Sequence, residues 1–381
     1  MVYLTLLCVL IFCTVKYIEQ PVHSKGYSKW IWIVSLSMIA IAALRYEIGA
    51  DTFLSYMPNY ENYNDIAHLT FDDFDNTDYQ PGWVVLIALC KYIYPDFYFF
   101  QLVHALILNL SILYFLKNNS KNIFAALLSY FIINYLEFNT ECLREAMAIS
   151  FVLIAFEMFK RKKYFWTAVL SFIAFNFHVS AIGALIIPLI HNTKFTRKSF
   201  VIISIVALLS PFIYQFIPDQ AKFVISVTGK ADLVNWYNNR EFSTTLNINY
   251  YIQHVVYYVF IPMSLVLYNL KKGKGKYIGY AYAFSILQML AVFSYGFYRF
   301  ANYIAPFYWL MIAECIYYFF NSSKNKPVFA FIVMVLIGCF VYQGKLLGPD
   351  SDNRMIESSK LYDRYFPYKT WLIEDTKIRI I

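Results

Sequence analysis

The feature of this sequence that most restricts its fold is a series of apolar segments, each long enough to cross a lipid bilayer. The hydrocarbon core of a bilayer is about 30 Å thick and needs roughly 20 apolar residues of α-helix to span it. Such segments recur along nearly the whole chain. Their predicted bounds are 1–18, 30–46, 97–116, 122–137, 143–159, 199–217, 251–270, 277–297, 299–320 and 327–344.

The composition supports the same interpretation. Of the 381 residues, 60% are hydrophobic and 15% are charged, whereas soluble domains average roughly 45–50% apolar and about 25% charged residues. So much apolar surface needs lipid around it. We therefore expect an all-α, polytopic integral membrane protein with about 12 transmembrane helices, in a single transmembrane domain that covers residues 1–381. Nothing in the charge pattern indicates a nucleic-acid partner.

The placement of Lys and Arg predicts the topology, because basic residues collect in cytoplasmic loops. Two segments are ambiguous: 82–95 is short for a crossing, and 164–190 is long for one and contains His178 midway. All basic loops share one side if 82–95 does not cross and 164–190 forms a helical hairpin. The opposite, extracytoplasmic side then holds loops at about 46–81 and 218–250, turns near Arg144 and Arg299, and the tail 345–381.

Polar residues gather on that extracytoplasmic side. After the second span, Arg45 and Asp51 flank Gly49, and Tyr56 and Tyr60 follow four residues apart. A short helix that begins at Asp51 or Thr52 would carry both rings on one face, and its N-terminus would favour an anion. The simpler interpretation is that Asp51 caps this helix and Arg45 reaches the headgroups.

Three further groups interrupt apolar sequence. Arg144 opens a span, where a charge is costly unless it is paired, with Glu141 for example, or faces a wet cavity. His178 lies with Asn176 and Ser180 inside 164–190; histidine can act as acid or base, although a helix–helix hydrogen bond is the simpler role. Arg299 and Tyr303 are four residues apart and share a helical face, or anchor a span end.

The three arginines, Arg45, Arg144 and Arg299, are predicted to reach the same side of the membrane. Guanidinium groups match phosphate oxygens and stay charged, so they suit a lipid-linked pyrophosphate. The chain has no P-loop and no GxSxG, HExxH or paired CxxC motif. The aspartates at 72, 73, 75 and 78 could bind a cation, but a solvated loop is the favoured interpretation. We expect no metal and no cofactor.

In order, the motifs R-x-x-x-G-x-D-T-x-x-x-Y at Arg45, L-R-E-A-M-A-I at Leu143, F-H-V-S-A at Phe177 and Y-R-F-x-x-Y at Tyr298 resemble the EpsG family, which is related to Wzy-type O-antigen polymerases. The tail YDRYFPYKTWL is also similar. The resemblance implies a GT-C-like membrane glycosyltransferase of the bacterial inner (plasma) membrane. It would polymerise undecaprenyl-pyrophosphate-linked oligosaccharide repeat units into O-antigen, capsule or exopolysaccharide on the extracytoplasmic side. Its partners would be that lipid-linked substrate, the bilayer and a chain-length regulator.

The resemblance also implies residue roles. Arg45, Arg144 and Arg299, with Tyr56 and Tyr303, would bind the pyrophosphate and glycan.

Either His178 or Asp51 would take the proton from the acceptor hydroxyl, and His178 is favoured by its ordinary pKa. Two alternatives stay open: a transporter or flippase of lipid-linked sugars, which should show internal repeats, and a membrane O-acyltransferase that uses His178. The sugars, the linkage and the stereochemical course do not follow from the sequence.

Overall fold

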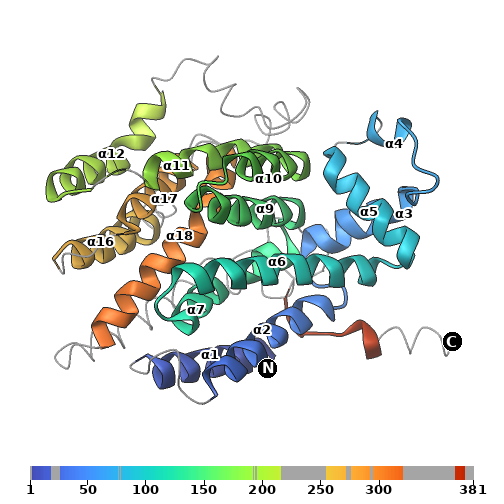
Figure 1. Cartoon of the computed structure of the whole chain (residues 1–381), viewed down its shortest axis with the longest axis horizontal. Coiled ribbons are helices and arrows are strands. Elements are labelled where there is room, and N and C mark those ends of the chain that lie inside the picture. Colours follow the sequence, from blue (N-terminus) through green and yellow to red (C-terminus); the bar gives the residue numbers. More distant parts are fainter. Residues whose placement is uncertain are drawn as a thin grey trace. The chain divides into compact units, whose positions relative to one another are not determined.

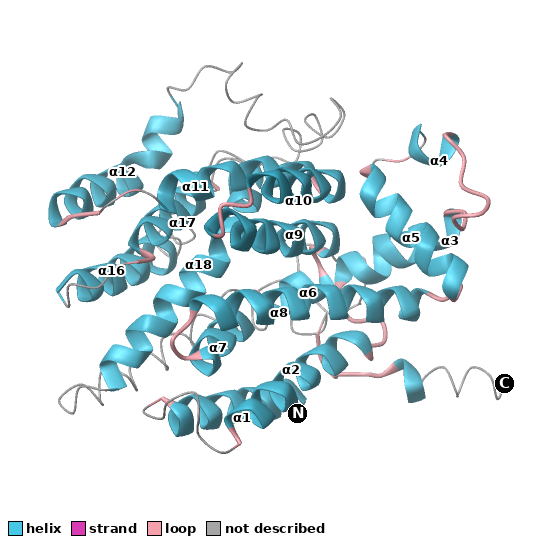
Figure 2. Cartoon of the chain, in the orientation of Figure 1, coloured by secondary structure: helices cyan, strands magenta, loops and turns pink. Residues whose placement is uncertain are grey.

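The regular structure of this chain is helical. The computed structural model describes residues 2–18, 26–75, 77, 79–191, 193, 195–215, 255–271, 276–291, 295–320 and 365–373. Within these ranges every regular element is a helix or a helical turn (Figures 1 and 2). The exception is an isolated β-bridge between Arg45 and Thr370. The all-α prediction is confirmed.

The contacts divide the chain into two compact units. The first comprises Met1–Ser150 and Ile316–Ile381, and the second comprises Phe151–Cys315. Helices α9 (Leu143–Lys160) and α18 (Tyr295–Phe320) contribute residues to both units. The single domain expected from the sequence stays a prediction, and each unit is described by itself.

The first unit is built on the contacts of α2 with α6 and of α1 with α7. Its helices include α1 (Val2–Tyr17), α2 (Tyr27–Ala43), α5 (Pro81–Ile93), α6 (Phe97–Asn119), α7 (Ile123–Ile133) and the short α8 (Tyr135–Thr140). Every residue from Ile123 to Ile132 is buried, as expected of a helix that is apolar on all sides. Hydroxyl groups in these helices donate back to their own backbone, as Ser129 does to the Ala125 carbonyl at 2.9 Å.

Short helical elements fill the loop between α2 and α5. A π-helical turn, Thr52–Tyr56, runs directly into α3 (Met57–Asn62), and α4 (Asp72–Asp75) follows. Tyr56 and Tyr60 are both buried, and their rings contact Trp83 at 5.4 Å and Phe100 at 5.7 Å. Because Trp83 and Phe100 also contact each other, the two tyrosines share one helical face, as the spacing predicted.

The second unit contains most of α9 and α18. Its other elements are α10 (Tyr164–Phe177), a 3-10 turn (Val179–Leu185), α11 (Ile186–His191), α12 (Arg197–Gln215), a π-helical turn (Val256–Phe260), α16 (Ile261–Lys271) and α17 (Ile278–Leu290). Helix α12 packs against α17. Helix α18 begins at Tyr295, so Arg299 lies within the first two turns of this helix. The expected turn between two spans near Arg299 is therefore wrong.

The segment 164–191 doubles back on itself. The backbone of His178 is extended and separates α10 from the 3-10 turn. The ring of Phe159, near the end of α9, contacts Tyr164 at 6.2 Å and His191 at 6.3 Å, so the two ends of the segment meet the same ring. The predicted helical hairpin is therefore present, with His178 at its turn.

Two helical stretches are long and apolar enough to cross a bilayer, Phe97–Asn119 and Gly296–Phe320, and several apolar helices are shorter. These helices support a membrane protein, while the count of about 12 spans stays a prediction. Helix α5 has 13 residues and is about 20 Å long, and the expectation that 82–95 does not cross the membrane stays a prediction. The predicted span 327–344 and the loop 218–250 lie outside the described residues.

Candidate functional site

Arg45 is buried inside the loop that carries the first group of predicted site residues. Its side chain is only 1% exposed and donates to the carbonyl of Ala42 and, at 3.4 Å, to the hydroxyl of Thr52. The loop after it comes very close to the chain at Thr140, because a Cβ on Gly49 would lie 2.6 Å from the Thr140 Cβ. Gly49 also has a φ of 97°, which favours glycine. Arg45 therefore stabilises this loop from within, a position that does not favour direct contact with substrate.

Glu141 occupies the N-terminus of the helical segment that begins at Ala50. Its carboxylate accepts hydrogen bonds from the backbone N–H of Ala50 at 3.2 Å and of Asp51 at 2.9 Å. The hydroxyl of Tyr365 donates to the same carboxylate at 2.9 Å. The anion that we expected at this N-terminus is thus the protein's own carboxylate. The Asp51 side chain makes no capping hydrogen bond, so the capping role considered for it is wrong.

Buried amides fix the turn that carries Glu141 and Arg144. Asn109 of α6 donates to Asn139 of α8 at 2.9 Å, Asn139 donates to the hydroxyl of Tyr130 at 2.9 Å, and Tyr130 donates back to Asn109 at 3.1 Å. A closed network of this kind satisfies polar groups that would be costly to bury alone. It holds the end of α8 and hence the start of α9 in one geometry.

Arg144, in the first turn of α9, lies against residues of the 46–80 loop. Its Nη1 donates to the Oε1 of Gln80 at 3.2 Å, and its guanidinium carbon lies 4.3 Å from the ring centre of Tyr79. The ion pair with Glu141 that we considered is not formed. Among the described residues, no carboxylate forms an ion pair with Arg144, and its Nε is buried without a hydrogen-bond partner. Arg144 is therefore a half-buried cation that can still pair with an anion.

Aromatic rings surround this arginine. Tyr79 contacts the rings of Tyr56, Tyr63 and Trp83 at 6.1–6.5 Å. Burial raises the pKa of the Tyr56 phenol above its ordinary value, and the charge of Arg144 acts in the opposite direction. The phenol of Tyr56 is therefore protonated at neutral pH and can donate a hydrogen bond.

We call Asp51, Tyr56, Tyr79, Gln80 and Arg144 the Arg144 cluster. Sequence reasoning missed Tyr79 and Gln80. Their one signal was the Pro81 at the start of α5, which places the two preceding residues at a helix N-terminus.

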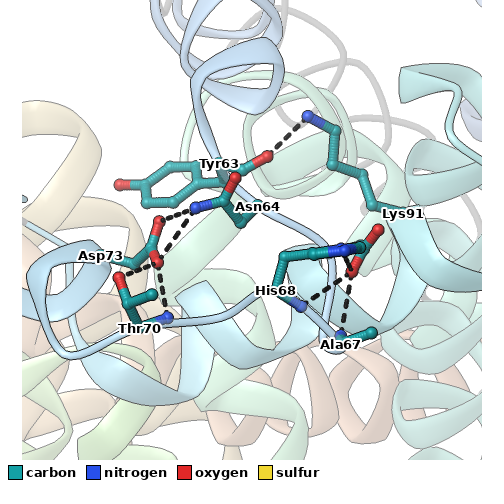
Figure 3. A network of polar contacts seen from close by, with 8 residues as sticks. Tyr63, Asn64, Ala67, His68, Thr70, Asp73 and Lys91 are labelled. Atoms are coloured by element: carbon teal, nitrogen blue, oxygen red, sulfur yellow. Dashed lines mark hydrogen bonds and ion pairs between the residues drawn. The ribbon is translucent and has the colours of Figure 1, made fainter.

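The loop next to this cluster is held by its own polar contacts (Figure 3). The Asp73 carboxylate accepts hydrogen bonds from the backbone and hydroxyl of Thr70, both at 2.8 Å, and from the Asn64 amide. The ammonium group of Lys91 donates to the carbonyl of Tyr63, the residue that follows α3, and to that of Glu61 within α3. Asp73 thus accepts hydrogen bonds within a solvated loop, which was the interpretation favoured over a cation site. Asp78 lies outside the described residues. The part of the chain that the structure describes contains no group of three metal-ligating side chains.

His178 anchors a second polar group, in the second unit. Arg299 Nη1 lies 2.8 Å from His178 Nε2, His178 Nδ1 lies 2.5 Å from the Ser180 hydroxyl, and that hydroxyl lies 3.1 Å from the Tyr303 hydroxyl. We call these four residues the His178 cluster. Asn176 instead donates to the Phe172 carbonyl of its own helix.

The partners of His178 determine its tautomer. A guanidinium can only donate, so Nε2 must accept with its lone pair, and a neutral ring then carries its proton on Nδ1. That proton points to Ser180 Oγ, so the longer 3.2 Å approach of the Ser180 N–H to Nδ1 is not a hydrogen bond in this tautomer. While Arg299 is bound, the Nε2 lone pair is not available to take a substrate proton.

The predicted site residues thus fall into two groups, one in each unit. Asp51, Tyr56 and Arg144 lie together, with Arg45 beneath them, and His178, Arg299 and Tyr303 lie together. The roles predicted for all of them stay predictions.

Comparison with known proteins yields one finding. The model of the EpsG family matches residues 28–370, which include both clusters and all but the last two residues of the tail motif, so the resemblance seen in the motifs is confirmed. No curated protein and no solved structure matches the chain.

Proposed function

Because this chain belongs to the EpsG family, whose members are membrane-associated and linked to exopolysaccharide biosynthesis, we propose that it is a Wzy-like polysaccharide polymerase. The substrate is an oligosaccharide repeat unit carried on undecaprenyl pyrophosphate. The site works on the extracytoplasmic side of the bacterial plasma membrane. The observation that carries the proposal is Arg144: a half-buried cation that lies on an aromatic ring and has no carboxylate partner among the described residues.

The reaction is a glycosyl transfer. A hydroxyl oxygen of the acceptor unit attacks the anomeric carbon of the donor glycan, and the bond from that carbon to the pyrophosphate oxygen breaks. The acceptor proton passes to a base on the protein, and undecaprenyl pyrophosphate leaves with the bonding electrons. Negative charge grows on the leaving oxygen in the transition state, so a fixed cation such as Arg144 lowers the barrier.

The surroundings of Arg144 suit this ligand. Gln80 and the Tyr79 ring orient the guanidinium, and the protonated Tyr56 phenol supplies a further donor for a pyrophosphate oxygen or a sugar hydroxyl. The Tyr63 ring stacks on Tyr79 and is half-buried, so it offers an apolar surface of the kind on which a sugar ring can pack.

The base is Asp51 in this account. His178 was favoured for its ordinary pKa, but its Nε2 lone pair is taken by a guanidinium. The Asp51 side chain is exposed, and its backbone is fixed by Glu141. Its charge raises the pKa of the Tyr56 phenol, whereas that of Arg144 lowers it. We assign to His178 the positioning of Arg299, and the binding of pyrophosphate by Arg299 stays a prediction.

One observation bears on the acyltransferase alternative. The hydroxyl of Ser180 and the guanidinium of Arg299 give His178 polar partners that the sequence did not suggest. The same guanidinium blocks Nε2, and Nδ1 faces Ser180 Oγ within the protein. A histidine held on both nitrogens suits orientation better than proton abstraction from an acyl acceptor.

A reconstituted assay tests the proposal. The purified protein in detergent is supplied with the authentic lipid-linked repeat unit, and the products are separated by size. We expect a ladder of lipid-linked glycans that differ by one repeat unit. Translocation of intact lipid-linked units across a proteoliposome membrane, with no ladder, would replace the polymerase by the flippase alternative.

A further inference from the structure

The described part of the tail, residues 365–373, closes the end of α2. The last carbonyls of a helix have no partner within it. Here the Trp371 indole donates to the Ala43 carbonyl at 3.1 Å, and the Tyr368 hydroxyl donates to the Ile41 carbonyl at 3.0 Å. Backbone hydrogen bonds from Tyr46 to Lys369 and from Trp371 to Leu44 complete the β-bridge at Arg45. The tail segment is therefore joined to the backbone on both sides of Arg45.

One side chain of this segment reaches the proposed site. Tyr365 is only 2% exposed, and its hydroxyl donates to the Glu141 carboxylate. The two residues are 224 positions apart in the sequence. The same carboxylate accepts the N–H groups of Ala50 and Asp51. Tyr365, Glu141 and the Asp51 backbone thus form one chain of hydrogen bonds that ends at the residue we assign as the base.

We infer that Glu141 and Tyr365 are positioning residues of the transfer reaction, which hold Asp51 in place from the tail of the chain. The inference rests on the proposed function. Neither residue has to touch substrate: both oxygens of Glu141 accept hydrogen bonds from the protein, and Tyr365 is buried. Their effect passes through the backbone of Asp51, whose carboxylate must meet the acceptor hydroxyl.

The arrangement has the features of a positioning device. A carboxylate that accepts three hydrogen bonds from two separate segments is fixed in direction as well as in place. Directly beside it, the loop at Gly49 comes so close to Thr140 that an added Cβ would lie 2.6 Å from the Thr140 Cβ. A displacement of about 1 Å in a reacting group can lower turnover on the order of 100-fold, so a modest loosening of this chain has a measurable result.

Two tyrosines of the same segment provide a matched test. Tyr365→Phe and Tyr368→Phe each remove one hydroxyl and one hydrogen bond of nearly equal length, but only the first bond ends on Glu141. We measure kcat and KM for the lipid-linked donor from initial rates of the ladder, and the melting temperature of each variant. Tyr365→Phe should lower kcat about ten-fold with KM within about two-fold, because the contacts of Arg144 with Gln80 and Tyr79 are unchanged. Tyr368→Phe should melt at a similar temperature and keep kcat within about two-fold of the wild type.

Glu141→Gln completes the test. It keeps the shape of the side chain but replaces one acceptor oxygen by an amide that faces another donor, so kcat should fall on the order of 100-fold. Adding Tyr365→Phe to Glu141→Gln should cause little further loss, since Tyr365 acts through Glu141. Equal losses of kcat in the two tyrosine variants, or fully additive losses in the double variant, would overturn the inference while the wild-type ladder leaves the proposed function intact. A wild type that forms no ladder overturns the function itself.

Discussion

Substitution of Arg144 is the sharpest perturbation that the structure offers. In Arg144→Ala the Arg144 cluster loses its cation, together with the hydrogen bond to Gln80 and the contact with the Tyr79 ring. In Arg144→Lys the charge remains, but the planar group that lies on Tyr79 and the fork of N–H donors are lost.

The expected magnitudes follow from these contacts. Removing one donor that stabilises transition-state charge costs about 2.7–4 kcal/mol, which is on the order of 10²–10³ in kcat. Lysine retains the charge, so Arg144→Lys should lose about ten-fold, which corresponds to ~1.4 kcal/mol. The structural cost is smaller: one hydrogen bond and one cation–π contact are worth about 1–2 kcal/mol together, so both variants should fold.

The assay is the rate of ladder formation at saturating lipid-linked donor, with the melting temperature as a check on folding. Arg161→Ala is the matched control, because this exposed arginine lies in the turn after α9 and has no proposed contact with substrate. We expect the control to keep full activity. Wild-type rates in Arg144→Ala, or equal losses in Arg144→Ala and Arg161→Ala, would refute the assignment of Arg144.

Three further predictions follow from other parts of the structure. His178→Gln keeps an acceptor for Arg299 while His178→Ala does not, so the glutamine variant should retain roughly ten-fold more activity than the alanine variant; equal inactivity, with both proteins folded, would restore His178 as the base. Gly49→Ala should lower the melting temperature more than Gly26→Ala. Both glycines have a positive φ, which costs about 1 kcal/mol for alanine. Of the two positions, only at 49 would the added Cβ lie within 3 Å of a neighbouring atom. Hydrogen bonds from Thr70 lower the pKa of Asp73, so this contact stabilises the loop above the ordinary Asp pKa of about 3.9 and loses its effect as the pH falls through the lowered value. As the pH is lowered, pepsin should therefore begin to cut residues 63–75 at a higher pH in Asp73→Ala than in the wild type or in the control Asp72→Ala. Identical cutting profiles in all three proteins would contradict this role.

Much of the architecture could be predicted from the sequence, because it depends on local properties. The apolar segments indicated helices, and the basic residues at Lys160–Lys163 and Lys194–Lys198 required the chain to return to the same side, which predicted the hairpin around His178. A polar residue in the middle of apolar sequence marked the turn correctly. The position of Arg144 at the start of a helix was also predictable.

The partners of these residues were not predictable, because they come from distant segments. Glu141 lies three residues before Arg144 and looked like its ion-pair partner. Its carboxylate instead caps the helical segment that begins at Ala50, some 90 residues away in the sequence. Tyr79 and Gln80 lie against Arg144 only because the 46–80 loop folds back over the start of α9. The tail motif indicated a family but no contact, and Tyr365 meets Glu141 across 224 positions. The burial of Arg45 was not predicted either: its side chain is 1% exposed, and its backbone forms a bridge with Thr370 in the tail.

The central claim, glycosyl transfer from a lipid-linked donor, is tested most directly by counting its two products together. Each new glycosidic linkage must release one undecaprenyl pyrophosphate, so the amounts of linkage formed and of pyrophosphate released should rise in equal proportion for the wild type. Both should fall together in Arg144→Ala. Ladder formation without release of undecaprenyl pyrophosphate, or translocation of lipid-linked units with neither product, would contradict the account.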